Sequence, residues 1–241
     1  MSGHSKWNNI KHKKEKADAA KAKIFTKIGK EMAVAIKAGG PDPNNNSKLR
    51  DLIAKAKANN VPNENIQRTI KKFSDNNDIN FEEITYEGYG PSGVAIIVET
   101  STDNRNRTAG NVRAWFSKYG GNLGQNGCVS YLFEEKGVIT IMDEDGELEE
   151  DKVMEDALEC GAEDLKCDEG EYTIYTATDD LDAVRDAIVA LGYTISTADL
   201  AKVPSTYVEL ESEDDIENME KMLDKFNEDD DVNAVYTNWD N

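Results

Sequence analysis

Six stretches between Val138 and Ala198 decide the fold prediction: VITIM (138–142), EEDKVMEDALE (149–159), EDLKC (163–167), YTIYT (172–176), DLDAVRDAIVAL (180–191) and YTISTA (193–198). The four shorter stretches have the composition and length of strands, and the two longer ones have the apolar spacing of helices. Their order, strand–helix–strand–strand–helix–strand, is that of a ferredoxin-like sandwich. Residues 135–204 are therefore predicted to form one acidic α+β domain.

The segments on either side of this domain predict a second sandwich. Strands are expected at 83–87, 94–100, 128–133, 207–210 and 232–239, and helices at 107–119 and 214–226. The strand–helix–strand unit before residue 134 and the one after residue 205 complete a second ferredoxin-like set of elements. We therefore expect residues 80–134 and 205–241 to form one discontinuous α+β domain, into which residues 135–204 are inserted.

Residues 1–79 are predicted to form a basic helical domain. A helix is expected from Ala20 to Ala38, a second one after the capping residue Ser47, and a third one that ends near Phe73. The apolar face of the first helix contains Ile24, Phe25, Ile28, Met32 and Ile36, and its lysines are expected on the opposite face. Residues 1–20 are interpreted as a basic arm. The predicted fold class is α+β, with an N-terminal three-helix bundle and two ferredoxin-like domains, the third inserted into the second.

Charge is strongly segregated along the chain. The formal net charge of the 241 residues is −20. Residues 1–72 hold 17 Lys+Arg and 6 Asp+Glu, or +11, and residues 73–241 hold 11 and 42, or −31. A cationic segment attached to anionic domains indicates a protein that binds a polyanion through one end only.

Nucleic acid is the polyanion that this pattern favours. Lysines supply phosphate contacts, histidines can donate to phosphates or base edges, and an aromatic ring can stack on a base. For Trp7 the sequence leaves stacking and packing against the bundle equally open. The candidate nucleic-acid-binding residues are Gly3, His4, Ser5, Lys6, Trp7, Lys11, His12, Lys13, Lys14, Lys16, Lys23, Lys27, Lys30, Arg68, Lys71 and Lys72.

Other motifs favour structural roles. The Thr102–Thr108 segment follows a strand and precedes a helix, so it could hold a phosphate, but a helix cap is the favoured interpretation. The glycine-rich stretches 88–93 and 120–124 match neither a P-loop nor a dinucleotide fingerprint and are interpreted as turns. The acidic run 143–146 lacks carboxylates at the first and twelfth positions of a calcium loop, which excludes that motif.

Enzymatic activity has little support in the sequence. The two histidines lie in the arm, no serine or cysteine has a plausible base beside it, and no metal-ligand spacing is present. The expectation is a non-enzyme with no catalytic residue, no cofactor and no metal. The absence of a long apolar run or signal peptide predicts no membrane association, and three unpaired cysteines favour the reducing cytoplasm. The oligomeric state is left open, with a monomer as the simpler expectation.

Several motifs together resemble one family. GHSKW (3–7), GGPDP (39–43), YEGYGP (86–91), TDN (102–104) with Arg107-Thr108, and GGNLG (120–124) occur in the order of the YebC family. That family includes the mitochondrial translational activator of cytochrome c oxidase. The resemblance covers the full chain and implies three domains, the third inserted into the second. It also implies a non-enzymatic regulator of gene expression, with members described as DNA-binding transcriptional regulators and others as ribosome-associated factors that relieve stalling.

Two functions follow from these observations, and a third stays open. A cationic arm suits irregular or single-stranded RNA, and the sequence shows neither helix-turn-helix spacing nor a dimer zipper, which favours a translation factor that binds ribosomal RNA or the ribosome. The alternative is a DNA-binding transcriptional regulator, which the usual description of the family favours. A protein-interaction module whose basic domain binds an acidic partner is the third class.

Overall fold

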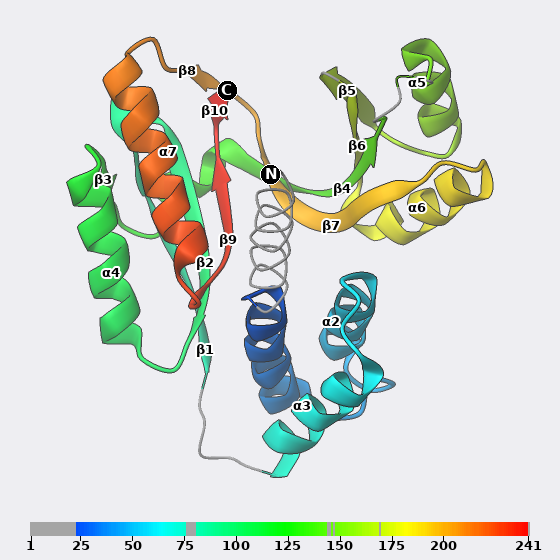
Figure 1. The fold of residues 1–241 in the computed structure, drawn as a ribbon, viewed down its shortest axis with the longest axis horizontal. Helices are drawn as coiled ribbons and strands as arrows, with labels where there is room; N and C mark the ends of the chain where they lie inside the picture. The colour runs from blue at the N-terminus through cyan, green and yellow to red at the C-terminus, as the bar shows by residue number, and fades with distance from the viewer. Residues whose placement is uncertain (1–22, 76–80, 144–145, 147, 169, 241) are drawn as a thin grey trace, which may run out of the picture. The chain divides into compact units, whose positions relative to one another are not determined.

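The computed structural model describes residues 23–75, 81–143, 146, 148–168 and 170–240 (Figure 1). The chain forms two compact units, one of residues 130–208 and one that combines the segment before 130 with residues 209–239. The elements of the first unit are a helix at 23–39, α2 (Ser47–Ala58), α3 (Asn63–Asp75), β1 (Glu82–Tyr89), β2 (Ala95–Thr102), α4 (Arg105–Lys118), β3 (Asn122–Leu123), α7 (Glu213–Glu228) and β9 (Val232–Thr237). Those of the second unit are β4 (Phe133–Met142), α5 (Glu150–Glu159), β5 (Asp164–Asp168), β6 (Glu171–Thr176), α6 (Leu181–Ala190) and β7 (Ile195–Pro204). Two short strands, β8 (Val208–Glu209) and β10 (Trp239–Asp240), pair with each other.

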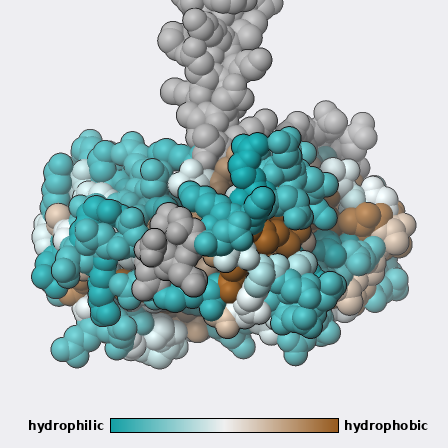
Figure 2. Space-filling view, turned by 90° about the horizontal axis from the view of Figure 1, so that it is seen from below, coloured by the Kyte–Doolittle hydropathy of each residue, from teal (hydrophilic) through white to brown (hydrophobic). Residues whose placement is uncertain are grey.

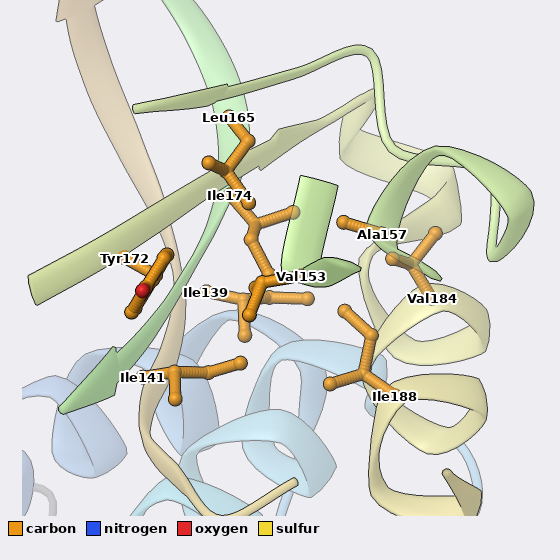
Figure 3. Packing of buried hydrophobic residues seen from close by; sticks show 9 residues of the cluster. All are labelled: Ile139, Ile141, Val153, Ala157, Leu165, Tyr172, Ile174, Val184 and Ile188. Atoms are coloured by element: carbon orange, nitrogen blue, oxygen red, sulfur yellow. The ribbon is translucent and has the colours of Figure 1, made fainter. Parts of the chain in front are cut away.

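The second unit is the predicted ferredoxin-like sandwich. Its sheet has the order β5-β6-β4-β7 with every neighbouring pair antiparallel. Every second residue of β4 and β6 points toward α5 and α6, because side chains alternate across a strand. Figure 3 shows the resulting core, in which Ile139 and Ile174 are fully buried against Val153 and Ile188. The sequence pattern of 138–198 therefore predicted this unit correctly.

The ends of the second unit lie on paired strands. β4 pairs with β7 from Phe133, opposite Pro204, to Ile141, opposite Ile195, with one register shift after Thr140. Cross-strand partners have Cα atoms about 4.5–5.5 Å apart. The chain therefore enters and leaves this unit at nearly the same point, as an inserted domain requires.

The first unit contains a second four-stranded antiparallel sheet, with the order β3-β1-β2-β9. β2 is buried along almost its whole length and lies under α4 and α7 (Figure 1). The two helices meet through Phe116 and Phe226, whose ring centroids are 5.3 Å apart, and Trp115 packs edge-on against Phe226 at 5.6 Å. The fold class predicted from sequence is confirmed, and the boundaries chosen for the three domains stay a prediction.

Two details of the predicted sheet were wrong. The expected strand at 128–133 does not form, because Ser130–Leu132 is a turn of 3-10 helix and β4 begins only at Phe133. The strand expected at 207–210 does not join this sheet, because Val208–Glu209 pairs with β10 instead. The central position next to β2 is occupied by β1, which precedes β2 in the chain. A hairpin partner competes well for this place because it needs only a short loop to reach β2.

The helices of the first unit pack around a small apolar core. Ile28, Met32 and Ile36 of the first helix contact Leu49 of α2 and Ile66 of α3. The expected inward position of Ile24 was wrong, since 37% of this residue is exposed. The cap of α2 is Asn46 rather than Ser47: its side chain accepts a hydrogen bond from the Leu49 backbone at 3.0 Å and donates to the carbonyl groups of Ala35 and Gly40 at 2.8 Å.

We expect residues 130–208 to fold as an isolated fragment with one cooperative unfolding transition. Ile174→Ala should lower its free energy of unfolding by about 2–5 kcal/mol, because the side chain is fully buried and leaves a cavity. Val189→Ala, at an exposed position of α6, is the matched control and should change the value by less than about 0.5 kcal/mol. Urea denaturation of the three fragments measures this, and a fragment without a cooperative transition would contradict the prediction.

Candidate nucleic-acid interface

The candidate residues fall into three groups. Gly3 to Lys16 lie outside the described residues. Lys23, Lys27 and Lys30 lie on the first helix and are half-buried, whereas Arg68, Lys71 and Lys72 lie on α3 and are exposed. The structure therefore separates two sets of cations that the sequence analysis treated as one surface.

The cations of α3 face solvent. Arg68 forms an ion pair with Glu64 at 3.0 Å, but both side chains are more than 70% exposed, so this pair contributes little stability. The ammonium group of Lys72 lies 5.2 Å from the centroid of the Phe73 ring. These side chains can therefore exchange their present contacts for phosphate oxygens at small cost.

Sequence reasoning missed the cations of α2. Arg50 and Lys57 are exposed and lie two turns apart, and Lys48 pairs with Glu83 at 2.7 Å. Their spacing could have indicated this, because Arg50 and Lys57 are seven residues apart and so lie on the same face of the predicted helix. α2 and α3 are joined by only four residues, 59–62, which is a spacing found in helix-turn-helix motifs. The expectation of no helix-turn-helix spacing therefore does not hold for this pair of helices.

The lysines of the first helix are held by the acidic segment Glu228–Asp231, which follows α7. The ammonium group of Lys30 donates to the Asp231 carboxylate at 2.6 Å and to the Asp230 backbone carbonyl at 2.9 Å. That of Lys23 donates to the Glu228 carbonyl at 3.3 Å. Burial lowers the pKa of Lys27, an effect that repulsion from Lys23 strengthens and that Asp230 and Asp229 partly offset. Each of the three lysines is therefore within electrostatic reach of this one segment.

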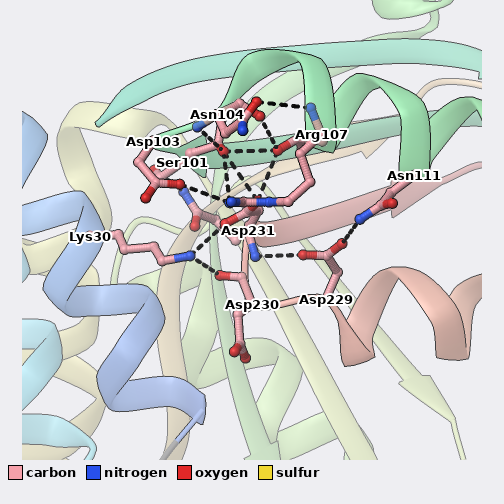
Figure 4. A network of polar contacts seen from close by, with 12 residues as sticks. Lys30, Ser101, Asp103, Asn104, Arg107, Asn111, Asp229, Asp230 and Asp231 are labelled. Carbon is pink, nitrogen blue, oxygen red and sulfur yellow. Dashed lines mark hydrogen bonds and ion pairs between the residues drawn. The ribbon is translucent and has the colours of Figure 1, made fainter. Parts of the chain in front are cut away.

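Asp231 is the centre of this network (Figure 4). Its carboxylate accepts hydrogen bonds from Lys30 at 2.6 Å, Arg107 at 2.7 Å, Thr108 at 2.8 Å and Thr102 at 3.1 Å, and only 5% of the side chain is exposed. Burial alone would raise the pKa of Asp231, but the hydrogen bonds from Lys30, Arg107 and Thr108 lower it to about 2. The carboxylate is therefore charged at any physiological pH.

The body of the first unit holds the acidic segment in place. The Asp231 carbonyl accepts a hydrogen bond from the Ser101 backbone at 2.8 Å, and its own backbone N–H donates to the Asp229 carboxylate at 2.7 Å. Asn111 donates to Asp229 at 3.2 Å. A hollow of about 350 Å³ beside the segment is lined by Lys30, Phe81, Asp103, Arg107 and Asp229–Asp231.

The Thr102–Thr108 motif has the favoured structural role. Asn104 is the N-cap of α4, and its side chain accepts a hydrogen bond from the Arg107 backbone at 3.1 Å. Thr102, Arg107 and Thr108 turn toward Asp231 instead of leaving a vacant anion site. The cap interpretation is confirmed.

The glycine-rich stretches form turns only in part: 90–93 and 120–121 are turns, as expected, whereas Gly88 lies in β1 and residues 122–123 form β3. A Cβ atom on Gly88 would lie 2.5 Å from the Asn122 carbonyl oxygen, and one on Gly121 would lie 2.5 Å from that of Tyr89. The buried carboxylate of Glu87 accepts hydrogen bonds from the backbones of Gly127 at 2.8 Å and Val129 at 3.0 Å. These contacts fix the chain where it leaves the first sheet.

The described residues contain no group of three or more His, Cys, Asp and Glu side chains placed to hold a metal ion. Burial raises the pKa of Cys128 and of Cys160, so neither thiol is activated as a nucleophile. No helix within the described ranges has both the length and the apolar character that a bilayer span requires. Hydrophilic residues cover most of the face seen in Figure 2, with smaller hydrophobic patches among them.

Two family models match the chain over most of its length. The model described as the TACO1/YebC protein N-terminal domain matches residues 5–76, and that of the TACO1/YebC second and third domain matches residues 81–239. The chain belongs to the TACO1/YebC family. Lys30 therefore lies in the part matched by the N-terminal model, and Asp231 in the part matched by the other.

Relatives in the TACO1/YebC family match from end to end. A probable transcriptional regulatory protein of Agathobacter rectalis is 56% identical over 241 residues, which is 100% of both chains. Another of that name, from Acetivibrio thermocellus, is 54% identical over 240 residues, 99% of both chains. A crystal structure of a conserved hypothetical protein from Aquifex aeolicus superposes with a TM-score of 0.81 at 43% identity, over 92% of this chain and 91% of that one.

The pKa of Asp231 predicts how this TACO1/YebC protein responds to acid. A carboxyl group whose pKa is lower in the folded state stabilises the fold above its unfolded pKa, here 3.8, and loses that contribution as the pH falls toward 2. We expect Asp231→Asn to lower the free energy of unfolding at pH 7 by at least about 2 kcal/mol. The difference from wild type should shrink steadily between about pH 4 and pH 2.

Urea denaturation of both proteins at several pH values measures this difference. Asp224→Asn, at an exposed position on α7, removes the same charge and should change stability by less than about 0.5 kcal/mol. A pH-independent gap between wild type and Asp231→Asn would show that the ionised carboxylate is not the stabilising group.

Proposed function

We propose that the chain is a non-enzymatic, nucleic-acid-binding regulator of gene expression, and that its target is RNA on or near the ribosome. The observation that carries this proposal is the segregation of charge. Residues 23–75 hold 11 Lys+Arg and 5 Asp+Glu, or +6, whereas residues 130–208 hold 5 and 22, or −17. Phosphate neutralisation by a cationic surface supplies most of the sequence-independent affinity for nucleic acid.

The position of the exposed cations supports this proposal. Arg68, Lys71 and Lys72 share one helix, and Arg50 and Lys57 lie on the neighbouring helix of the same bundle. These exposed cations belong to the first unit, whereas the acidic residues 130–208 form the second unit. Long-range repulsion between those acidic residues and phosphates disfavours close wrapping along a duplex, where phosphates lie on every side. A groove in a large RNA particle can bind the basic residues while residues 130–208 stay outside it, away from the phosphates.

The basic arm, residues 3–16, extends the same proposal. Its lysines and Trp7 combine phosphate contacts with a ring that can stack, which suits single-stranded and irregular RNA. Relief of ribosome stalling is the activity that we propose for such binding. Relatives named probable transcriptional regulatory proteins support the broader part, a regulator of gene expression.

DNA binding is the second candidate, and one structural observation favours it. α2 and α3 are joined by a four-residue turn, and the first turns of α3 expose Asn63, Asn65, Gln67 and Arg68. Amide and guanidinium groups at the start of a recognition helix are the side chains that read base edges in the major groove. A transcriptional role therefore predicts strong preference for one duplex sequence.

The exposed cations of α3 should account for a measurable part of the affinity. The triple variant Arg68→Gln, Lys71→Gln, Lys72→Gln should bind a 20-nucleotide single-stranded RNA at least about tenfold more weakly at 50 mM salt. Each lost phosphate contact removes about 0.7 from the slope of log affinity against log salt, so the slope should become shallower by about 2.

The matched control removes three cations from acidic parts of the chain. Lys152→Gln, Lys221→Gln, Lys225→Gln changes the net charge equally and should leave the salt slope unchanged. Fluorescence anisotropy at four salt concentrations measures both. Equal slopes for the two triple variants would mean that α3 does not contact phosphates.

The cellular target can be tested by gradient sedimentation of a lysate. We expect the protein to migrate with ribosomal particles at low salt and to be released at high salt, since the contact is electrostatic. The α3 triple variant should remain at the top of the gradient. Protein that stays at the top at every salt concentration, but binds one promoter about 1000-fold more tightly than random duplex, would establish the DNA alternative instead.

A further inference from the structure

The lysines of the first helix already have an anionic partner within the same chain. Lys30 uses two of its three N–H donors on the segment Glu228–Asp231, one to a carboxylate and one to a backbone carbonyl. Lys23 donates to a further carbonyl of the segment. Of the candidate cations that the structure describes, those of α3 are exposed and those of the first helix are half-buried.

The ligands that this segment offers resemble those of a nucleic-acid backbone. A phosphodiester presents anionic and ester oxygens at regular intervals, and an ammonium group accepts either carboxylate or phosphate oxygens in charge-assisted hydrogen bonds. The carbonyl oxygen of residue 228 contacts Lys23, and the carbonyl oxygen of residue 230 and the carboxylate of Asp231 contact Lys30, two turns further along the same helix. Phosphates cannot occupy the same donors at the same time.

We propose that the segment Glu228–Asp231 is an internal competitor of nucleic-acid phosphates for Lys23, Lys27 and Lys30. Nucleic acid that reaches these lysines must first open the contact between the first helix and this segment. The inference rests on the proposed function, because it concerns how the same basic region is regulated. The exposed cations of α3 remain available for the first encounter.

The contact can open without destroying the site that holds the acidic segment. Asp231 keeps hydrogen bonds from Arg107, Thr102, Thr108 and the Ser101 backbone when Lys30 leaves, and all four come from β2 or α4. The opening therefore costs the ion pair of Lys30 with Asp231, its hydrogen bond to the Asp230 carbonyl and the weaker contact of Lys23. Lys27 loses the favourable charges of Asp229 and Asp230 at the same moment, which the charges of the phosphates replace.

The variant Asp230→Asn tests the competition between the segment and phosphates without removing a hydrogen bond that holds the segment to the first helix. Its side chain is exposed and acts on Lys27 through space, whereas Lys30 contacts only the backbone carbonyl, which the substitution keeps. Removing one competing charge should tighten binding of the 20-nucleotide RNA about threefold or more at 50 mM salt. The gain should disappear near 1 M salt, where the screening length falls to about 3 Å.

Glu220→Gln is the matched control. Glu220 is exposed on α7, eight residues before Glu228, which corresponds to about 12 Å along a helix. The control removes the same net charge and should leave the affinity within about 1.5-fold of wild type, since Glu220 lies farther from the lysines and is not among the charges that act on Lys27. If it tightens binding as much as Asp230→Asn, the effect is one of total charge and the competitor role is overturned.

A second measurement follows the lysines themselves. Brief acetylation of the intact protein, with each lysine quantified by mass spectrometry, should show faster modification of Lys23 and Lys27 in Asp230→Asn than in wild type. Lys71, which is exposed on α3, should react equally in both and serves as the internal reference. Equal reactivity of Lys23 and Lys27 in both proteins, together with equal affinity, would overturn the proposal.

The same titrations separate failure of this inference from failure of the proposed function. They are run with the single-stranded RNA and with a 20-base-pair random DNA duplex, which distinguish the two sources of phosphodiester. If wild type and Asp230→Asn bind with equal affinity, the competitor role alone is lost. If neither protein binds either probe, both the nucleic-acid function and the competitor role are wrong.

Discussion

The buried carboxylate of Asp231 is the interaction on which the arrangement of the first unit depends. An isolated charge in such a position would cost several kcal/mol, so it persists only where donors surround it. Lys30, which supplies one of them, lies 201 residues away in the sequence, and the others come from the end of β2 and the start of α4. One side chain therefore ties the C-terminal strand to the helical segment and to the centre of the sheet.

This constraint divides the basic residues by environment. A lysine that faces an acidic segment of its own chain is already neutralised, whereas one on the outward face of α3 is available to any anion. Net charge alone does not reveal this difference, since both kinds count equally in the total. Under the proposed function, the first contact with a polyanion therefore falls to the exposed cations, and later contacts require the paired lysines to release the acidic segment.

The sequence predicted those parts of the fold in which local pattern and burial coincide. Ile139, Ile141 and Ile174 alternate along strands because one face of the sheet is covered, and that periodicity was sufficient to place residues 138–198. It could not place β3, which has only two residues, or show that β1 fills the inner position of the first sheet.

The contacts of the paired lysines could not be predicted from the sequence, for a different reason. Helical periodicity separates the polar face of the first helix from its apolar face, but it does not show what the polar face contacts. The sequence pattern predicts Lys23 and Lys30 to be exposed to solvent, because it cannot show their partners at the end of α7 and just after it, about 200 residues along the chain. The exposed cations of α3 were identified correctly because α3 has only one covered face, which leaves its charged side in water.

The pairing of β2 with β9 has a consequence for synthesis of the chain on the ribosome. Ile96 of β2 pairs with Thr237, so the first sheet lacks an edge strand until residues 232–237 have been synthesised. Residues 130–208 have all their own strands and helices well before that moment, and we expect them to fold while the chain is still being made. Until then, the backbone N–H and C=O groups along one edge of β2 have no partner strand. The Lys30–Asp231 contact therefore cannot form before the whole of the second unit has been synthesised.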